Sequence, residues 1–396
     1  MKAIKIKIIS LLVIGLTILD YFFGKYSDNF GNPLPDIVRV ILIIISIRYI
    51  IGSKKFKFFF KNRFNKIYFL IIIYLFFACL FSPVGIEGSM MNFVRIFYPF
   101  LLLMSCYLLS FSGHVSKKQI YFLYKNSILV IFALIIAFLG YKAGIGRMDI
   151  GDNKAYMLLF CTPIIFLFFP KTKAIFYYSL IIIGSLIASK RGAFLGVFFT
   201  FLIFIYSFKQ FKSQSKFIIL LGLPLLLAVM YNYFAESIFI FERFEQLEED
   251  GGSGRDVMSL VIWEGWQKAE FFNQIFGSGW MSELLYVKSA LFMRKGLAAH
   301  NDWLQFLYDL GLVGISLLLS MFYALFKQIR TYKRKDKLYY ALICASGIFF
   351  MRSISGGTFG ETATMPFLFI GLGFILGQVD RINYRTPKKR IGLNKV

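Results

Sequence analysis

The sequence has few of the residues from which most metal and redox sites are built, with two histidines and four cysteines among its 396 residues. The cysteines are Cys79, Cys106, Cys161 and Cys344. All four fall inside apolar stretches, so they predict small buried side chains and exclude a disulfide framework or a zinc site. The chain also lacks a Cys-x-x-Cys pair, a His-Glu-x-x-His motif, a phosphate-binding Gly-Lys-Ser/Thr loop and a Gly-x-Ser-x-Gly elbow. None of the common metal, nucleotide or hydrolase signatures is therefore present.

Charged residues are also scarce, because they make up 17% of the chain against about 25% in soluble domains, while 58% of the chain is hydrophobic. This composition excludes a soluble globular protein. The 49 phenylalanines exclude a disordered chain, because they cannot stay unburied in water. The sequence shows no internal repeat, which counts against transporter folds built from duplicated halves.

Twelve stretches are long and apolar enough to predict membrane-spanning helices, which need roughly 17–25 predominantly apolar residues. They cover residues 6–23, 35–52, 65–82, 92–111, 120–141, 155–169, 174–189, 192–208, 216–236, 302–326, 338–354 and 362–379. Lysines precede the first stretch as in a signal peptide, but no small-residue cleavage site follows, so we expect an uncleaved first helix. The sequence thus predicts an all-α integral membrane protein, with residues 1–396 forming a single polytopic membrane domain.

Acidic residues are outnumbered, with 21 against 45 lysines and arginines, which gives a net charge of +24. Such a balance is typical of nucleic-acid binders, so the position of the charges decides what it means. The basic residues concentrate in residues 1–7, 53–66, 112–119, 170–173, 209–216, 327–337 and 380–396. These segments alternate between the predicted helices, hold 28 of the 45 basic residues and carry +26, which leaves −2 for the remainder. Because basic connections stay in the cytoplasm, both termini are predicted to be cytoplasmic and nucleic acid is excluded as a partner.

One connection is much longer than the others: residues 237–300, between the ninth and tenth predicted helices on the extracytoplasmic side. Its tryptophans and phenylalanines favour an ordered segment, and loops of this length are usually functional. Spacings of four and three residues predict one amphipathic helix from Ser253 to Gly277, lying on the membrane surface or roofing the bundle. Ser253 and Asp256 have capping-box form at its start, and Gly277 would end it. The apolar face would consist of Met258, Ile262, Gly265, Ala269, Phe272 and Phe276.

Four arginines fall on the extracytoplasmic side, where the cytoplasmic bias does not explain them. They are Arg95, Arg147, Arg191 and Arg255. Arg255 would stand in the first turn of the loop helix, beside backbone N–H groups that favour an anion; an ion pair with Asp256 is the alternative. Arg191 lies at a predicted helix end, where snorkelling is the alternative to a function. Together the four suggest an anionic ligand on this face.

His300 ends the long loop, directly before Asn301, which we predict to be the N-cap of the tenth helix. A neutral imidazole at the mouth of that helix can take a proton from a hydroxyl, whereas neighbouring Asp302 would favour the charged form. A structural role is the alternative for a single interfacial histidine. The other histidine, His114, lies in a short cytoplasmic turn and predicts a solvated side chain.

The stretch from Ala299 to Gly314 resembles the signature of the O-antigen ligase/O-antigen polymerase superfamily. It has His300-Asn301, a leucine three residues on, and the acidic Asp309 before Gly-Leu-x-Gly. Ser253-Gly254-Arg255 with the aromatic-rich helix after it is similar to the superfamily's long periplasmic loop. Residues 189–193 (Ser-Lys-Arg-Gly-Ala) resemble its membrane-embedded arginine motif, and Arg147 with Asn153 resembles its earlier outer loop.

The resemblance implies a glycosyltransferase on the outer face of the bacterial inner membrane, which needs no metal, nucleotide sugar or other cofactor. Its donor would be a glycan on undecaprenyl diphosphate. Arg255 and Arg191 would stabilise the diphosphate, and His300 would activate the acceptor hydroxyl or contact a phosphate. Substrate-binding positions would be Arg147, Asn153 and Asn301. Arg95 is a further candidate because it lies near the extracytoplasmic end of the fourth predicted helix, although it belongs to none of these motifs. Expected partners are the lipid-linked oligosaccharide, membrane lipid, a chain-length regulator and a flippase.

The acceptor divides the superfamily. A polymerase transfers glycan to another lipid-linked repeat unit, and a ligase transfers it to lipid A-core. We favour the polymerase, because the Phe/Ile-rich sequence keeps only the shared signature residues. A carrier for an anionic solute or lipid-linked sugar, and a non-catalytic assembly scaffold, are alternatives from other classes. The structured loop and the missing duplication count against the carrier.

Overall fold

The computed structural model describes residues 2–23, 34–144, 152–188, 190–207, 255–291, 301–332, 334, 336–359 and 364–385. Within these ranges every regular element is an α-helix, which confirms the all-α prediction for the described part of the chain. Among the described residues, six helices are long and apolar enough to cross a membrane. They are α4 (Arg63–Leu80), α5 (Ile86–Ser112), α6 (Lys117–Gly144), α15 (Asp302–Thr331), α16 (Lys337–Ser355) and α17 (Met365–Arg385). The chain is therefore a multi-pass membrane protein by length and composition.

The bundle also contains α1 (Lys2–Phe23), α2 (Leu34–Ile51), α7 (Lys154–Phe168), α8 (Lys171–Ile187) and α9 (Arg191–Ser207). Eleven of the twelve predicted stretches thus coincide with a helix, within a few residues at each end. The remaining stretch, 216–236, lies outside the described residues. A short helix, α3 (Phe56–Phe59), precedes α4.

The centre of the bundle is the pair α5 and α17, whose side chains are mostly buried. Gly373 and Gly377, one turn apart on α17, lie directly against the backbone of α5 at Leu103 and Tyr107. Such small-xxx-small spacing lets two membrane helices approach closely. Ser110 Oγ strengthens the contact by donating a hydrogen bond of 2.7 Å to the carbonyl of Phe374.

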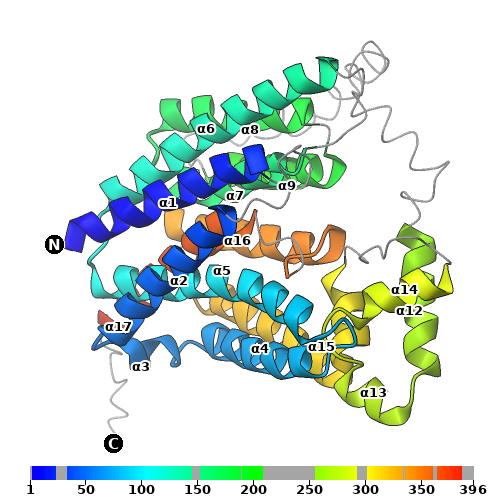
Figure 1. Cartoon of the computed structure of the whole chain (residues 1–396). Helices are drawn as coiled ribbons and strands as arrows, with labels where there is room; N and C mark the ends of the chain where they lie inside the picture. The colour runs from blue at the N-terminus through cyan, green and yellow to red at the C-terminus, as the bar shows by residue number, and fades with distance from the viewer. Residues whose placement is uncertain are drawn as a thin grey trace, which may run out of the picture.

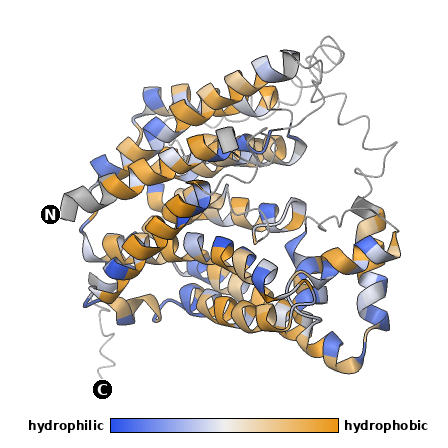
Figure 2. Ribbon diagram, viewed as in Figure 1, coloured by the Kyte–Doolittle hydropathy of each residue, from blue (hydrophilic) through white to orange (hydrophobic). Residues whose placement is uncertain are grey.

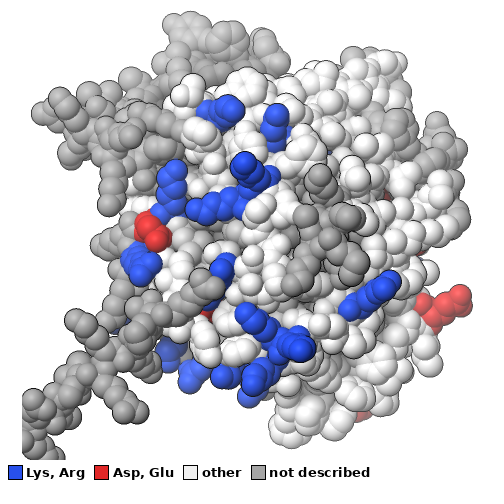
Figure 3. Space-filling view, turned by 90° about the vertical axis from the view of Figure 1, so that its left-hand side faces the viewer, with Lys and Arg blue, Asp and Glu red and all other residues white. Residues whose placement is uncertain are grey.

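The start of α1 and the end of α17 both lie on the left in Figure 1. Hydrophobic residues dominate the helices between the two ends (Figure 2). On the left-hand face Lys and Arg side chains gather (Figure 3). Exposed cationic side chains in the connections that the sequence predicts to be cytoplasmic include Lys54, Lys55, Lys57, Lys61, Lys117, Lys118, Arg330 and Lys337. The arrangement agrees with the predicted distribution of charge.

A partly buried carboxylate joins four helices at the same end. Asp380 of α17 accepts hydrogen bonds from Tyr107 Oη and Asn62 Nδ2, each at 2.7 Å, and from Gln328 Nε2 at 3.2 Å. These partners come from α5, the start of α4 and the end of α15. Because the carboxylate is satisfied by uncharged donors, it fixes the relative positions of these helices without an ion pair.

The loop helix is not continuous, and the prediction of one helix from Ser253 to Gly277 is wrong. Instead the segment forms α12 (Arg255–Lys268) and α13 (Phe271–Phe276), followed by α14 (Ser282–Ala290). The three helices lie together on the right in Figure 1, at the end of the bundle opposite to the basic face. The predicted end at Gly277 is confirmed, whereas Ser253 lies outside the described residues.

The helix break also changes which side chains are buried. Met258 and Ile262 are buried as predicted, in a small cluster with Val287 of α14 and Tyr308 of α15. Phe272 and Phe276 do not share that cluster, because the chain turns between α12 and α13, and both side chains are exposed. Crossed hydrogen bonds fix this corner: Trp266 Nε1 donates to the carbonyl of Gln274, and Gln274 Nε2 donates to that of Gln267.

Candidate active site

The signature stretch begins at the start of α15, where Asn301 is the N-cap. Its side-chain oxygen accepts hydrogen bonds from the backbone N–H groups of Trp303, at 2.9 Å, and Leu304, at 3.4 Å. This confirms the predicted capping role and uses the amide oxygen for structure. His300, the residue before it, lies outside the described residues.

Asp302 is fully buried and holds the connection between α16 and α17. Its carboxylate accepts hydrogen bonds from the backbone N–H of Thr358, at 2.7 and 2.8 Å, and from the Thr358 hydroxyl. The N–H of Phe359 donates to it at 3.3 Å. The residue therefore ties the mouth of α15 to residues 358–359. The expected influence of Asp302 on the charge of His300 is not tested, because His300 lies outside the described residues.

A second contact joins the same ends of α15 and α16, because Trp303 Nε1 donates a hydrogen bond of 3.1 Å to Ser353 Oγ. One position earlier, Arg352 points into the protein and is only 2% exposed. Its guanidinium lies over the ring of Tyr156 from α7, 3.8 Å from the ring centre. An aromatic face stabilises a desolvated cation, so this stacking links α16 to α7.

The sequence analysis did not identify Arg352 as a candidate site residue, because it lies inside the apolar stretch 338–354 that predicts a membrane span. Its signal was available in principle: it is an arginine at the predicted extracytoplasmic end of an apolar run, followed by Ser-Ile-Ser-Gly-Gly. No pattern in the sequence could supply its partner, since Tyr156 is almost two hundred positions away.

The arginine motif at residues 189–193 lies at the start of α9, next to Tyr156. Arg191 is the first residue of α9, and Gly192 lies against the hydroxyl of Tyr156 and near Ser355 Oγ. A side chain larger than hydrogen at Gly192 would clash with that hydroxyl. The start of α9 therefore lies beside the Arg352–Tyr156 pair, while the side chain of Arg191 itself lies outside the description.

The earlier outer-loop motif also adjoins this region through α7. Asn153 directly precedes α7, and among the described residues its side-chain oxygen is buried without a hydrogen-bond partner. Its neighbour Asp152 caps the helix instead, accepting from the backbone N–H and the ammonium group of Lys154, both at 3.0 Å. Arg147 lies outside the described residues.

Arg95 has an ion-pair partner on another part of the molecule. It lies 3.6 Å from Asp36 of α2, and Asp36 also pairs with Arg39. Arg39 in turn lies 2.7 Å from Asp20 of α1. Two arginines and two aspartates thus join α1, α2 and α5. This cluster explains Arg95 by packing and charge compensation, with no substrate required.

The long-loop helices are fastened to α15 by Asp309, the acidic residue of the signature. One carboxylate oxygen accepts from Ser282 Oγ at 2.8 Å and from the N–H of Glu283 at 2.9 Å; the other accepts from the N–H of Met281 at 2.7 Å. Gln305 Nε2 lies 3.5 Å from it. The carboxylate is fully buried and lies at the N-terminus of α14, where helix electrostatics favour an anion.

Two glycines make this docking possible. Gly311 has φ +66° and lies against the carbonyl of Ile275, and Gly277 has φ +86° and lies against the carbonyl of Asp309. A Cβ at either position would meet backbone atoms, and both φ values are ones that L-residues rarely adopt. The Gly-Leu-x-Gly part of the signature therefore allows the loop to cross α15 at backbone distance. Arg255 begins α12 of this docked unit, with its side chain outside the description.

The described backbone thus brings three of the four motif segments to one end of the bundle: the start of α7, the start of α9 and the start of α15. α16 packs against α7, α9 and α15, and its end carries Arg352. The fourth segment, α12 to α14, packs on the first turns of α15. This end therefore gathers three helix starts around the buried Arg352.

Comparison with known proteins agrees with this geometry. Residues 174–319 match the model of a protein family described as O-antigen ligase. The match includes the start of α9, the long loop and the signature stretch of α15. No curated protein matches the chain. The match over residues 174–319 and the motifs converging at this end of the bundle support the assignment of the chain to the O-antigen ligase/O-antigen polymerase superfamily.

Proposed function

We propose that the chain is a glycosyltransferase that takes a glycan from undecaprenyl diphosphate and transfers it to a hydroxyl on the extracytoplasmic face of the membrane. The observation that carries the proposal is the convergence of the motif segments at one end of the bundle. Within a few residues of the Arg352–Tyr156 stack lie the start of α9, at Arg191, and the start of α15, after His300. This end is opposite to the basic face.

In this proposal the acceptor hydroxyl attacks the anomeric carbon of the donor sugar, and the bond from that carbon to the diphosphate oxygen breaks. The leaving diphosphate takes the bonding electrons, and Arg191 and Arg255 stabilise its growing negative charge. His300 accepts the hydroxyl proton or contacts a phosphate. Arg147, Asn153 and Asn301 bind donor or acceptor. Guanidinium groups would replace a metal ion in this reaction.

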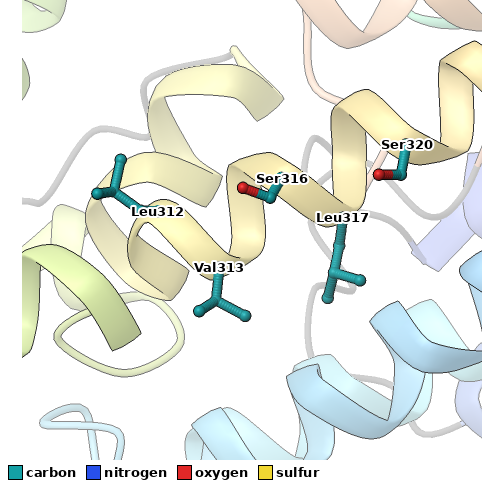
Figure 4. Close-up of a pocket in the computed structure, with 5 residues that line it drawn as sticks. All are labelled: Leu312, Val313, Ser316, Leu317 and Ser320. Atoms are coloured by element: carbon teal, nitrogen blue, oxygen red, sulfur yellow. The ribbon is translucent and has the colours of Figure 1, made fainter.

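A hollow along α15 supports a place for the prenyl tail. Its volume is about 300 Å³, and the described residues that line it are Leu312, Val313, Ser316, Leu317 and Ser320. Figure 4 shows the five side chains along successive turns of the helix, directly after the Gly311 crossing. We propose that part of the undecaprenyl chain lies there, with its diphosphate directed toward the start of α15.

We propose twelve spans with both termini in the cytoplasm, and the loop 237–300 outside. The distribution of exposed cations supports this orientation (Figure 3), because basic connections remain on the cytoplasmic side. The bacterial inner membrane is the proposed location, where a flippase would deliver the donor and a chain-length regulator would act on the product.

For the acceptor, we propose a second lipid-linked repeat unit, which makes the chain a surface-polysaccharide polymerase. The ligase reaction onto lipid A-core is the second candidate, because the matching family model carries the description O-antigen ligase. A deletion strain separates the two. Lipid A-core that bears a single repeat indicates a lost polymerase, and long chains accumulating on the lipid carrier indicate a lost ligase. A membrane carrier would instead leave undelivered repeats on the cytoplasmic leaflet.

The residue assignments are tested in the same strain with plasmid-borne variants. We expect His300→Ala, Arg191→Ala and Arg255→Ala each to abolish long-chain surface glycan while the protein still inserts in the membrane. Matched controls come from the opposite end: His114→Ala and Arg330→Ala change an exposed histidine and arginine and should leave chain length normal. If all three outer variants make glycan of normal length, the enzyme assignment fails.

A further inference from the structure

The helix α13 presents three phenylalanines to its surroundings. Phe271, Phe272 and Phe276 are 77%, 65% and 46% exposed, the highest density of exposed aromatic side chains in the described part of the long loop. The rings of Phe272 and Phe276 lie 4.8 Å apart, so they form one face of the helix. Exposed apolar area of this kind is costly in water and marks a contact surface.

The exposed phenylalanines lie on a helix whose backbone is held by hydrogen bonds to neighbouring helices. At its start, α13 is joined to α12 through the hydrogen bonds between Trp266 and Gln274. At its end, the carbonyl of Phe276 accepts a hydrogen bond of 2.7 Å from Tyr74 Oη of α4. The same hydroxyl lies 3.2 Å from the carbonyl of Leu310. The backbone of α13 is therefore held in place by hydrogen bonds to α12 and α4.

The position of α13 indicates what covers these rings. Tyr74 lies six residues before the end of α4, a helix apolar enough to span the membrane. Around that end of α4, Phe77, Leu80 and Phe81 are themselves exposed, as lipid-facing residues of a span must be. In Figure 2 the ribbon of α13 contains hydrophobic residues, as do the nearby helices of the bundle, and Figure 1 places α13 beside the ends of α4 and α15. The exposed face of α13 thus extends a lipid-facing surface.

We propose that α13 lies in the outer leaflet of the membrane, with Phe271, Phe272 and Phe276 among the lipids near the headgroups. Aromatic side chains favour that depth, and short apolar segments bind there without spanning. The charged residues of the preceding corner, Lys268 and Glu270, remain on the aqueous side. The long loop is then anchored at two places, by α13 in lipid and by the Asp309 contacts on α15. The inference does not depend on the glycosyl transfer proposed above.

The test uses an environment-sensitive fluorophore on a single introduced cysteine, because the four native cysteines are buried. Phe272→Cys carries the probe on α13, and Lys268→Cys is the control, since the Lys268 side chain is as exposed, at 74%, but lies on the other side of the corner. Both are measured in nanodiscs of phosphatidylethanolamine and phosphatidylglycerol, with nitroxide-labelled lipid and aqueous iodide as quenchers.

We expect the probe at position 272 to emit at shorter wavelength and to be quenched several-fold more by the nitroxide lipid than the probe at position 268. Iodide should quench the two probes in the opposite order. Equal iodide quenching at both positions overturns the proposal, because α13 would then be solvated. Shielding of position 272 from both quenchers also overturns it, since a protein partner or a second copy would then cover the helix.

Discussion

Replacing Asp309 by asparagine tests the clamp between the long loop and α15 with almost no change in shape. The carboxylate serves two backbone N–H groups, one on each oxygen, from Glu283 and Met281. An amide has only one oxygen, so in either orientation its NH₂ group faces a backbone N–H. Ser282 can rotate its hydroxyl, but a peptide N–H cannot become an acceptor.

The free-energy cost of Asp309→Asn follows from the number of hydrogen bonds that it changes. One hydrogen bond to a charged group is lost, one buried donor is left unsatisfied, and the remaining bonds lose their charge. Hydrogen bonds to charged groups contribute about 1.5–3 kcal/mol and a buried orphan donor costs about 1–3 kcal/mol, so we expect docking of the loop to weaken by about 2–4 kcal/mol. The bundle itself keeps its core, because the Asp309 contacts join α15 only to residues 281–283 and Gln305.

Hydrogen exchange followed by mass spectrometry measures this local opening. For peptides covering residues 278–290, exchange protection should fall roughly 30- to 900-fold, as 1.36 kcal/mol corresponds to a tenfold change. The matched control is Asp336→Asn, because Asp336 caps α16 at the surface with hydrogen bonds to Leu338 and Tyr339. Asparagine caps helices as well as aspartate does, so protection there should hardly change. If the two variants lose the same protection, the buried carboxylate does not hold the loop.

Three further changes have defined outcomes. Gly311→Ala should destabilise the protein by at least about 1–3 kcal/mol because of its positive φ. The control Gly88→Ala in α5 should be neutral or slightly stabilising, because the added Cβ would meet only Val84 Cγ1 at an ordinary contact distance of 3.5 Å. Unfolding in detergent compares the two variants, and equal stabilities contradict the backbone crossing. Arg352→Lys keeps the charge but loses the planar stack on Tyr156, so we expect the free energy of unfolding to fall by about 0.5–2 kcal/mol and the melting temperature to fall with it. An unchanged melting temperature would show that the stack does not stabilise the protein. Arg191→Gln and Arg255→Gln should abolish long-chain glycan while thermal stability stays the same or rises; a parallel loss of stability would make these residues structural.

Local patterns were sufficient for the helices of the bundle. Hydrophobicity is a property of each segment, so the eleven described stretches could be located from composition alone. The N-cap at Asn301 also followed from sequence, because a cap bonds to the next two or three residues of its own chain. Burial of the cysteines followed from the apolar stretches around them.

Contacts between distant segments could not be located in this way. The four-and-three spacing through residues 258–276 fits a continuous helix, but the hydrogen bonds of Trp266 with Gln274 turn the chain, and Phe272 then points outward. The partner of Asp302 could not be located either, because the donor Thr358 lies fifty-six residues along the chain. In both cases the arrangement depends on hydrogen bonds that helical periodicity does not report.

The arginines of the outer side divide into two kinds once the structure is known. Arg39 and Arg95 lie beside aspartates, and Arg352 lies over a tyrosine ring, so the fold itself explains why each is there. Arg191 and Arg255 are instead the first residues of α9 and α12. A cation at a helix N-terminus is disfavoured by the helix dipole, typically by about 0.3–1 kcal/mol, so helix stability does not account for either position. An anion at either helix start would reverse that penalty, since the backbone N–H groups and the guanidinium group would then act on the same charge. This position at a helix start is the physical reason for assigning Arg191 and Arg255 to the diphosphate in the proposed function.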